Sequence, residues 1–231
     1  MKTDLHSFDF PEDEDELLDS TYVEIFPPWE EDEFNRKLHQ LSDDRYEEIK
    51  LSVVELFEYA DVHAFPLDGF AIAERLGLKV VPYSSLSDAQ KTYVFKISED
   101  ASLFPGFKTI FYNDRKISGR ISMSLLHEIG HFWLKHTEHS ILAEKEAGFF
   151  AKFAMAPPVV IHCLALNDSE SLRHHFGLSL EASINVWHYY QKWANASELF
   201  TTQEMRTCRQ FGVIPPKKVT IKARENAMNT T

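Results

Sequence analysis

The chain has 231 residues, of which 44% are hydrophobic and 13% aromatic, so it can bury a core and a wholly disordered protein is excluded. Its apolar runs are far shorter than the ~18 to 20 residues that cross a bilayer, and residues 1–10 lack the basic and then apolar profile of a signal peptide. Two cysteines, Cys163 and Cys208, are too few for a disulfide framework and are predicted to be buried thiols. We therefore expect a soluble, cytoplasmic protein that does not associate with membranes.

The net charge of −12 belongs to one end of the chain. Residues 1–50 contain 17 acidic against 5 basic side chains, whereas the remaining 181 residues contain 19 of each. A chain with this distribution offers no basic stripe for phosphates, so direct binding of nucleic acid is not expected. Residues 1–42, acidic with scattered aromatics, are predicted to be a flexible, solubilising segment.

Two helices open the folded part. Ser42 and the two aspartates after it can cap a helix whose apolar residues recur at helical spacing, and a second helix is expected from the Asp68 cap to the Gly77 stop. Three β-branched or aromatic runs, residues 78–82, 92–97 and 108–112, then predict a small, mostly antiparallel sheet.

Helical periodicity returns after the sheet. We expect helices over about residues 117–136, 141–156, 179–194 and 201–211, and the proline pairs at 157–158 and 215–216 should end segments. The chain then divides into an acidic segment (1–42), a core (43–158), a C-terminal helical region (159–214) and a basic tail (215–231).

The sequence His-Glu-Ile-Gly-His at residues 127–131 lies in one of these predicted helices. Residues four apart share a helix face, so His127 and His131 can bind one metal ion while Glu128 points at the water that the metal activates. The apolar residues around this trio favour a buried helix behind a dry site. We therefore predict a zincin-like catalytic domain of α+β class, with Zn2+ as its cofactor and Glu128 as its general base.

A catalytic zinc needs a third protein ligand. The residues within reach along the chain are Glu138, Glu144, Glu146, His136 and His139. Glu144 and Glu146 lie on a predicted helix from which either could point inward, and spacing alone does not choose between them. His136 and His139 are expected to lie at the surface or behind the ligands.

Four segments in order resemble the ImmA/IrrE family of metallopeptidases. They are residues 73–81 (AERLGLKVV), 109–113 (TIFYN), 124–131 (SLLHEIGH) and 146–157 (EAGFFAKFAMAP). Gly148, Ala156 and Leu126 depart from the family pattern without touching a ligand position, and no helix-turn-helix module or sensor domain is evident. The resemblance implies that His127, His131 and Glu146 bind zinc and that Glu128 is catalytic.

The resemblance also implies a function, which is regulatory cleavage of a DNA-binding, helix-turn-helix repressor that releases transcription of a mobile element or of stress genes. Two alternatives remain open at this point. One is a peptidase acting on another protein such as an antitoxin, and the other is a catalytically silent, metal-binding regulator. The intact Glu128 argues against the silent regulator, because a pure binding site needs no general base.

Overall fold

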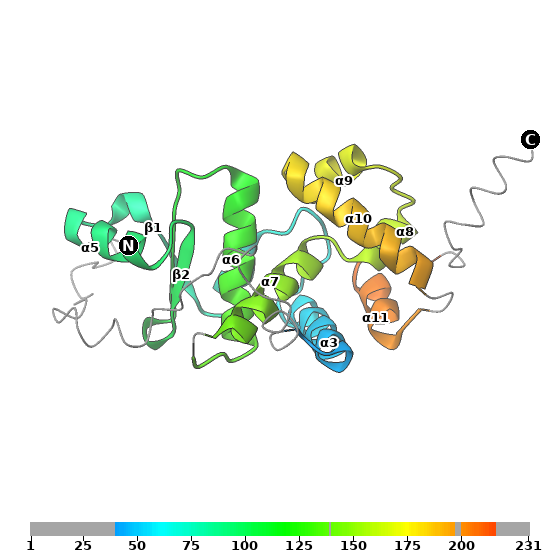
Figure 1. Cartoon of the computed structure of the whole chain (residues 1–231), viewed down its shortest axis with the longest axis horizontal. Coiled ribbons are helices and arrows are strands. Elements are labelled where there is room, and N and C mark those ends of the chain that lie inside the picture. Colours follow the sequence, from blue (N-terminus) through cyan, green and yellow to red (C-terminus); the bar gives the residue numbers. More distant parts are fainter. Residues whose placement is uncertain (1–39, 139, 197–199, 216–231) are drawn as a thin grey trace, which may run out of the picture.

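The computed structural model describes residues 40–138, 140–196 and 200–215, so the acidic segment before residue 40 and most of the basic tail lie outside the described residues. The fold is α+β and rich in helix, as predicted. Figure 1 shows the small sheet towards one end of the molecule, the C-terminal helices at the other, and helices α6 (Ser118–Trp133) and α7 (Ile141–Met155) between them.

The two opening helices form where the sequence predicts them. Helix α3 (Asp43–Tyr59) begins after Ser42, whose side chain accepts a hydrogen bond from the Arg45 backbone N–H. Helix α4 (Gly69–Arg75) begins after Asp68, which accepts from two backbone N–H groups, and the chain leaves it through Gly77 at a φ of 71°. Both starts are side-chain caps, and Gly77 takes the left-handed conformation that a non-glycine residue rarely adopts.

The sheet is mixed, and the expectation of a mostly antiparallel sheet is corrected. Its strand order is β1-β3-β2, with β1 (Lys79–Pro82) parallel to β3 (Thr109–Tyr112) and β2 (Ala101–Phe104) antiparallel to β3. Strands β2 and β3 form a hairpin around the short 3-10 turn η3 (Pro105–Phe107). Strand β1 is separated from that hairpin by a helix, which brings it alongside β3 in the parallel direction.

The prediction of a second strand over residues 92–97 is wrong. These residues form the end of helix α5 (Asp88–Ile97), and the strand that pairs with β3 comes later, at β2. A capping box starts the helix, because the Ser87 and Gln90 side chains each bond the other's backbone N–H. The Ser-x-x-Gln pattern was present in the sequence, and it outweighs the β-branched and aromatic composition of the run.

Helices α6 and α7 pack unusually closely. A Cβ placed on Gly130 of α6 would lie 3.1 Å from Cδ1 of Phe150 and 3.3 Å from Cα of Ala147, both on α7. Only a glycine allows this approach without displacing its neighbours. The two helices that carry the candidate ligands are therefore held at a separation set by one residue.

Four further helices follow in the described residues. They are α8 (Pro158–Cys163), α9 (Ser169–Phe176), α10 (Leu180–Ala196) and α11 (Thr202–Gln210). The prolines at 157 and 158 end α7 as expected, and they also start α8, which the sequence did not predict, with Pro158 in its first turn. Side chains of α8 to α11 share one hydrophobic core with α3, α4, α6 and α7. Among the described residues, no helix is both long and apolar enough to cross a membrane.

Candidate metal centre

Helix α6 presents the two histidines of the motif on one face. The Nε2 atoms of His127 and His131 lie 3.1 Å apart, and the side chains are only 24% and 9% exposed. Leu125, Leu126 and Ile129 anchor the opposite side of the helix in the core, where none of them is exposed. The amphipathic helix thus places its two histidines on the side away from these leucine and isoleucine side chains, which hold the helix in the core.

Glu144 on α7 completes a group of three potential ligands. Its Oε2 lies 3.0 Å from Nε2 of His127 and its Oε1 lies 3.2 Å from Nε2 of His131. Two atoms that each bind zinc at 2.0–2.1 Å in a tetrahedron lie ~3.3 Å apart, so these spacings suit one ion. Two imidazoles and a carboxylate are also a donor set that zinc accepts.

The carboxylate of Glu146, which the family resemblance gives as the third ligand, lies with Arg45 and His136 in this structure. Its Oε1 accepts a hydrogen bond from Nε of Arg45 at 2.8 Å, and its Oε2 lies 3.0 Å from Nε2 of His136 and also bonds Nη2 of Arg45. Glu144 and Glu146 are two residues apart on a helix, about 200° around its axis, so they cannot face the same point. Of the two glutamates between which spacing could not choose, the structure brings Glu144 to the histidines.

His136 lies directly behind His131. Their Nδ1 atoms are 2.9 Å apart, and the side chain of His136 is only 11% exposed. The other two positions considered differ, because Glu138 is exposed and residue 139 lies outside the described residues.

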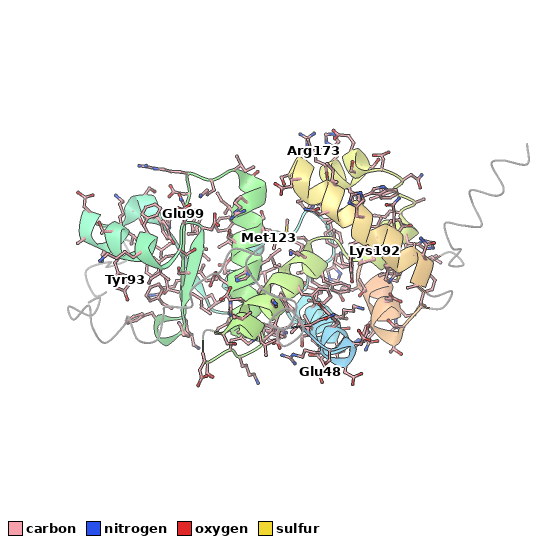
Figure 2. The ribbon with its side chains drawn as sticks, in the orientation of Figure 1. Glu48, Tyr93, Glu99, Met123, Arg173 and Lys192 are labelled. Atoms are coloured by element: carbon pink, nitrogen blue, oxygen red, sulfur yellow. The ribbon has the colours of Figure 1, made fainter. Side chains whose placement is uncertain are left out.

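The sequence did not predict that Arg45 lies at this site. It reaches the site from α3, 101 residues before Glu146, and its Nη1 also bonds Glu48 on the same helix at 2.7 Å. Figure 2 shows Glu48 on the outer side of α3. Its place in an acidic helix start resembles that of any surface arginine, so no local pattern could have singled it out.

The pKa values of the two histidines shift in opposite directions. Burial lowers the pKa of His127, but the hydrogen bond to Glu144 and the negative charge of Glu128 outweigh this and raise it above its ordinary value. Burial dominates at His131, where the neighbouring His127 and His136 add to it, and the pKa falls. This shift favours the neutral form of His131, which is the form that binds a metal.

Burial would raise the pKa of Glu146, but the hydrogen bonds from Arg45 and His136 outweigh it and lower the pKa. The hydrogen bond to the same carboxylate raises the pKa of Arg45, so each partner favours the charged form of the other.

Glu128 faces the sheet from the next position around α6. Its Oε2 accepts a hydrogen bond from the backbone N–H of Leu103 at 2.8 Å. Leu103 lies on β2, an outer strand of the sheet, and this N–H points away from β3. The candidate base is therefore fixed between the metal ligands and the sheet edge.

The sequence left the donor that would stabilise an oxyanion undecided among Tyr112, His162, His174, His175, His188 and Tyr189. Two of these are engaged with other side chains. Nδ1 of His162 lies 3.1 Å from the Tyr190 hydroxyl, and Nε2 of His174 lies 2.8 Å from Glu170. These two side chains have structural partners within the C-terminal helices, which makes them poor candidates.

A family model for the IrrE N-terminal-like domain, peptidase M78, matches residues 73–185. The chain belongs to the ImmA/IrrE family. The match includes the sheet, the two ligand-bearing helices and the C-terminal helices as far as α10, so it extends beyond the four segments that carry the resemblance in the sequence. Membership of this peptidase family points to a metallopeptidase.

No curated protein sequence matches this ImmA/IrrE family member. Among solved structures, a Mycobacterium tuberculosis transcriptional regulator is similar to it with a TM-score of 0.49 and 14% sequence identity. The similarity covers 70% of this chain and 51% of that one, so this chain spans about half the length of that structure.

Proposed function

We propose that this protein is a zinc-dependent endopeptidase in which His127, His131 and Glu144 hold the metal and Glu128 is the general base. The observation that carries the proposal is that two imidazole nitrogens and the two oxygens of one carboxylate make contacts of 3.0 to 3.2 Å beside the adjacent Glu128. Glu144 takes the place that the family resemblance gave to Glu146. A metal site used for binding alone would have no need of Glu128.

Zinc, when bound, would supply a polarised water molecule and a polarised scissile carbonyl. Glu128 would take the proton of the attacking water and pass it to the leaving amine. The hydrogen bond that the Glu128 carboxylate accepts from the Leu103 N–H orients it for this role. His131 and His127 would remain neutral donors, and Glu144 would bring one negative charge to the site.

The sheet edge offers a place for the substrate. Strand β2 has no strand partner on its outer side within the described part of the chain, and that side carries the Leu103 N–H that holds Glu128. An extended peptide can add to such an edge through backbone hydrogen bonds. A substrate bound there would lie beside Glu128, so this placement supports cleavage within an extended segment of a protein.

The natural substrate that we propose is a DNA-binding, helix-turn-helix repressor whose cleavage releases transcription. This rests on the function that the family resemblance implies. The rival substrate is an antitoxin-like partner, and the rival from another class is a regulator that binds metal without turnover.

Metal analysis and one catalytic variant test the proposal. Wild-type protein should contain stoichiometric zinc, and Glu144→Gln should lose it, while Glu146→Gln retains metal when zinc is supplied in excess. Loss in Glu146→Gln with retention in Glu144→Gln would restore Glu146 as the third ligand.

Glu128→Gln should keep its zinc and should cleave the helix-turn-helix repressor that wild type cleaves ~10² to 10⁴ times more slowly. If that variant performed its cellular role as well as wild type, the silent-regulator alternative would hold. If wild type cleaved a neighbouring antitoxin and left the repressor intact, the substrate would be the antitoxin.

A further inference from the structure

Behind the candidate ligands, four side chains form an unbroken line of polar contacts. His131 touches His136 through their Nδ1 atoms at 2.9 Å, Nε2 of His136 lies 3.0 Å from Oε2 of Glu146, and Arg45 holds both oxygens of that carboxylate. They come from α6, the turn after it, α7 and α3. We propose that Arg45, Glu146 and His136 are positioning residues that fix the tautomer of His131 in which Nε2 is the nitrogen that binds the metal. This inference rests on the proposed metal site.

With a neutral His136 ring, which this proposal takes as its starting point, the direction of every hydrogen bond in this line follows from its outer end. Arg45 can only donate, so the carboxylate of Glu146 is held as an acceptor. Nε2 of His136 must then carry a proton and donate it to Glu146, because a bare ring nitrogen would face a carboxylate oxygen. The other nitrogen of the neutral His136 ring, Nδ1, is left as an acceptor.

An accepting Nδ1 on His136 requires a proton on Nδ1 of His131. The neutral His131 ring would then present the lone pair of Nε2 to a metal ion bound between this atom, His127 and Glu144, which lie 3.1 and 3.2 Å away. The opposite arrangement would put a proton on the nitrogen that has to bind the metal. A ligand histidine whose second nitrogen is held by a further polar group has its orientation and tautomer fixed in this way.

The backbone places His136 for this role. Helix α6 ends at Trp133, and Lys135 takes a left-handed conformation with a φ of 60°. The turn returns the His136 N–H to the backbone carbonyl of His131, at 3.0 Å, and so brings the two rings side by side. A non-glycine residue at such a φ is uncommon, and here it serves to bend the chain back onto the ligand.

The test compares variants that keep or remove the line. In His136→Gln the amide oxygen can accept from His131 and the amide nitrogen can donate to Glu146, whereas His136→Phe preserves the ring shape without a nitrogen. Glu146→Gln removes the charged anchor. Glu138→Gln is the matched control, because it removes an exposed carboxylate near the same turn without touching the line.

Zinc affinity, measured by competition with a chromogenic chelator, should fall ~10- to 100-fold in His136→Phe and in Glu146→Gln. It should stay close to wild type in Glu138→Gln, and His136→Gln should lie nearer to wild type than to His136→Phe. Far-UV circular dichroism identifies any variant that does not fold, and the remaining variants then decide the result. Wild-type affinity in a folded His136→Phe or Glu146→Gln would overturn the proposal.

Nitrogen-15 NMR of the imidazole rings in zinc-free Glu144→Ala protein, in which no Glu144 carboxylate faces Nε2 of His131, provides a readout that does not depend on the metal. In this background His131 should carry its proton on Nδ1, and adding His136→Phe should give a mixture of the two tautomers. An Nδ1 proton retained in full after His136→Phe would refute the proposal. If wild type bound no zinc, the proposed function would fail, while this measurement would still decide whether the three residues fix the tautomer.

Discussion

The separation of α6 and α7 can be tested by adding one methyl group. Gly130→Ala places a Cβ 3.1 Å from Cδ1 and 3.3 Å from Cγ of Phe150, and 3.3 Å from Cα of Ala147. Phe150 and Ala147 are both fully buried, so neither can move into solvent. Because Glu144 lies on α7 and the two histidines on α6, displacing one helix also changes the ligand spacing.

The magnitude follows from two opposing contributions. Replacing glycine by alanine within a helix stabilises a protein by about 1 kcal/mol, whereas forcing a methyl group into a packed interior costs about 1–3 kcal/mol. Gly148→Ala on α7 is the matched control, since a Cβ there meets no atom within 4 Å. The free energy of unfolding should rise by about 1 kcal/mol in Gly148→Ala, and Gly130→Ala should lie about 1–3 kcal/mol below that control.

Denaturant unfolding of both variants provides these free energies, and chelator competition provides their zinc affinities. We expect weaker zinc binding in Gly130→Ala and unchanged binding in Gly148→Ala. If Gly130→Ala were as stable as Gly148→Ala and bound zinc as wild type does, the close approach of the two helices would have no part in forming the site.

Three further predictions concern the charges and the metal. Hydrogen bonds from Arg120 and, more weakly, the charge of Lys116 lower the pKa of Asp100. The ionised carboxylate therefore stabilises the fold at pH values above its unfolded-state pKa of about 3.9. This stabilisation disappears as the pH falls through the lower pKa of the folded state. Arg120→Met should therefore reduce the free energy of unfolding at neutral pH and match wild type in strong acid; an equal loss at every pH would contradict the assignment. Removing zinc with a chelator should lower the thermal midpoint, because a ligand at a hundred times its Kd stabilises the folded state by about 2.7 kcal/mol, and Glu144→Gln should show no such shift. Deleting residues 1–39 keeps the buried Leu41 and the Ser42 cap and should leave the cleavage rate unchanged at low and high salt. Slower and less salt-sensitive cleavage would indicate that these residues attract the substrate electrostatically. Faster cleavage would indicate that they cover the site.

Local chemistry explains what could be predicted from the sequence. The Ser42 and Asp68 caps, the Gly77 stop and the i, i+4 spacing of His127 and His131 all act within one or two helical turns, so the residues themselves carry the signal. The strand expected over residues 92–97 failed within the same range, because the capping box at Ser87 was given less weight than the composition of the run.

Contacts between distant elements could not be predicted in this way. Glu144 and Glu146 are both plausible ligands on one helix, and the choice between them depends on how α7 rotates against α6 and on the position of Arg45 a hundred residues earlier. The direction of β1 relative to β3 likewise depends on the path that α5 and β2 take between them.

By itself, then, the sequence predicted the helix that carries the two histidines and Glu128, and it indicated the family, because these depend on residue type and on spacing along the chain. The tertiary structure decided which glutamate faces the histidines and which arginine and histidine lie behind them. Those choices depend on the rotation and separation of packed helices, and both are set by core contacts such as that of Gly130 with Phe150, to which no local pattern corresponds.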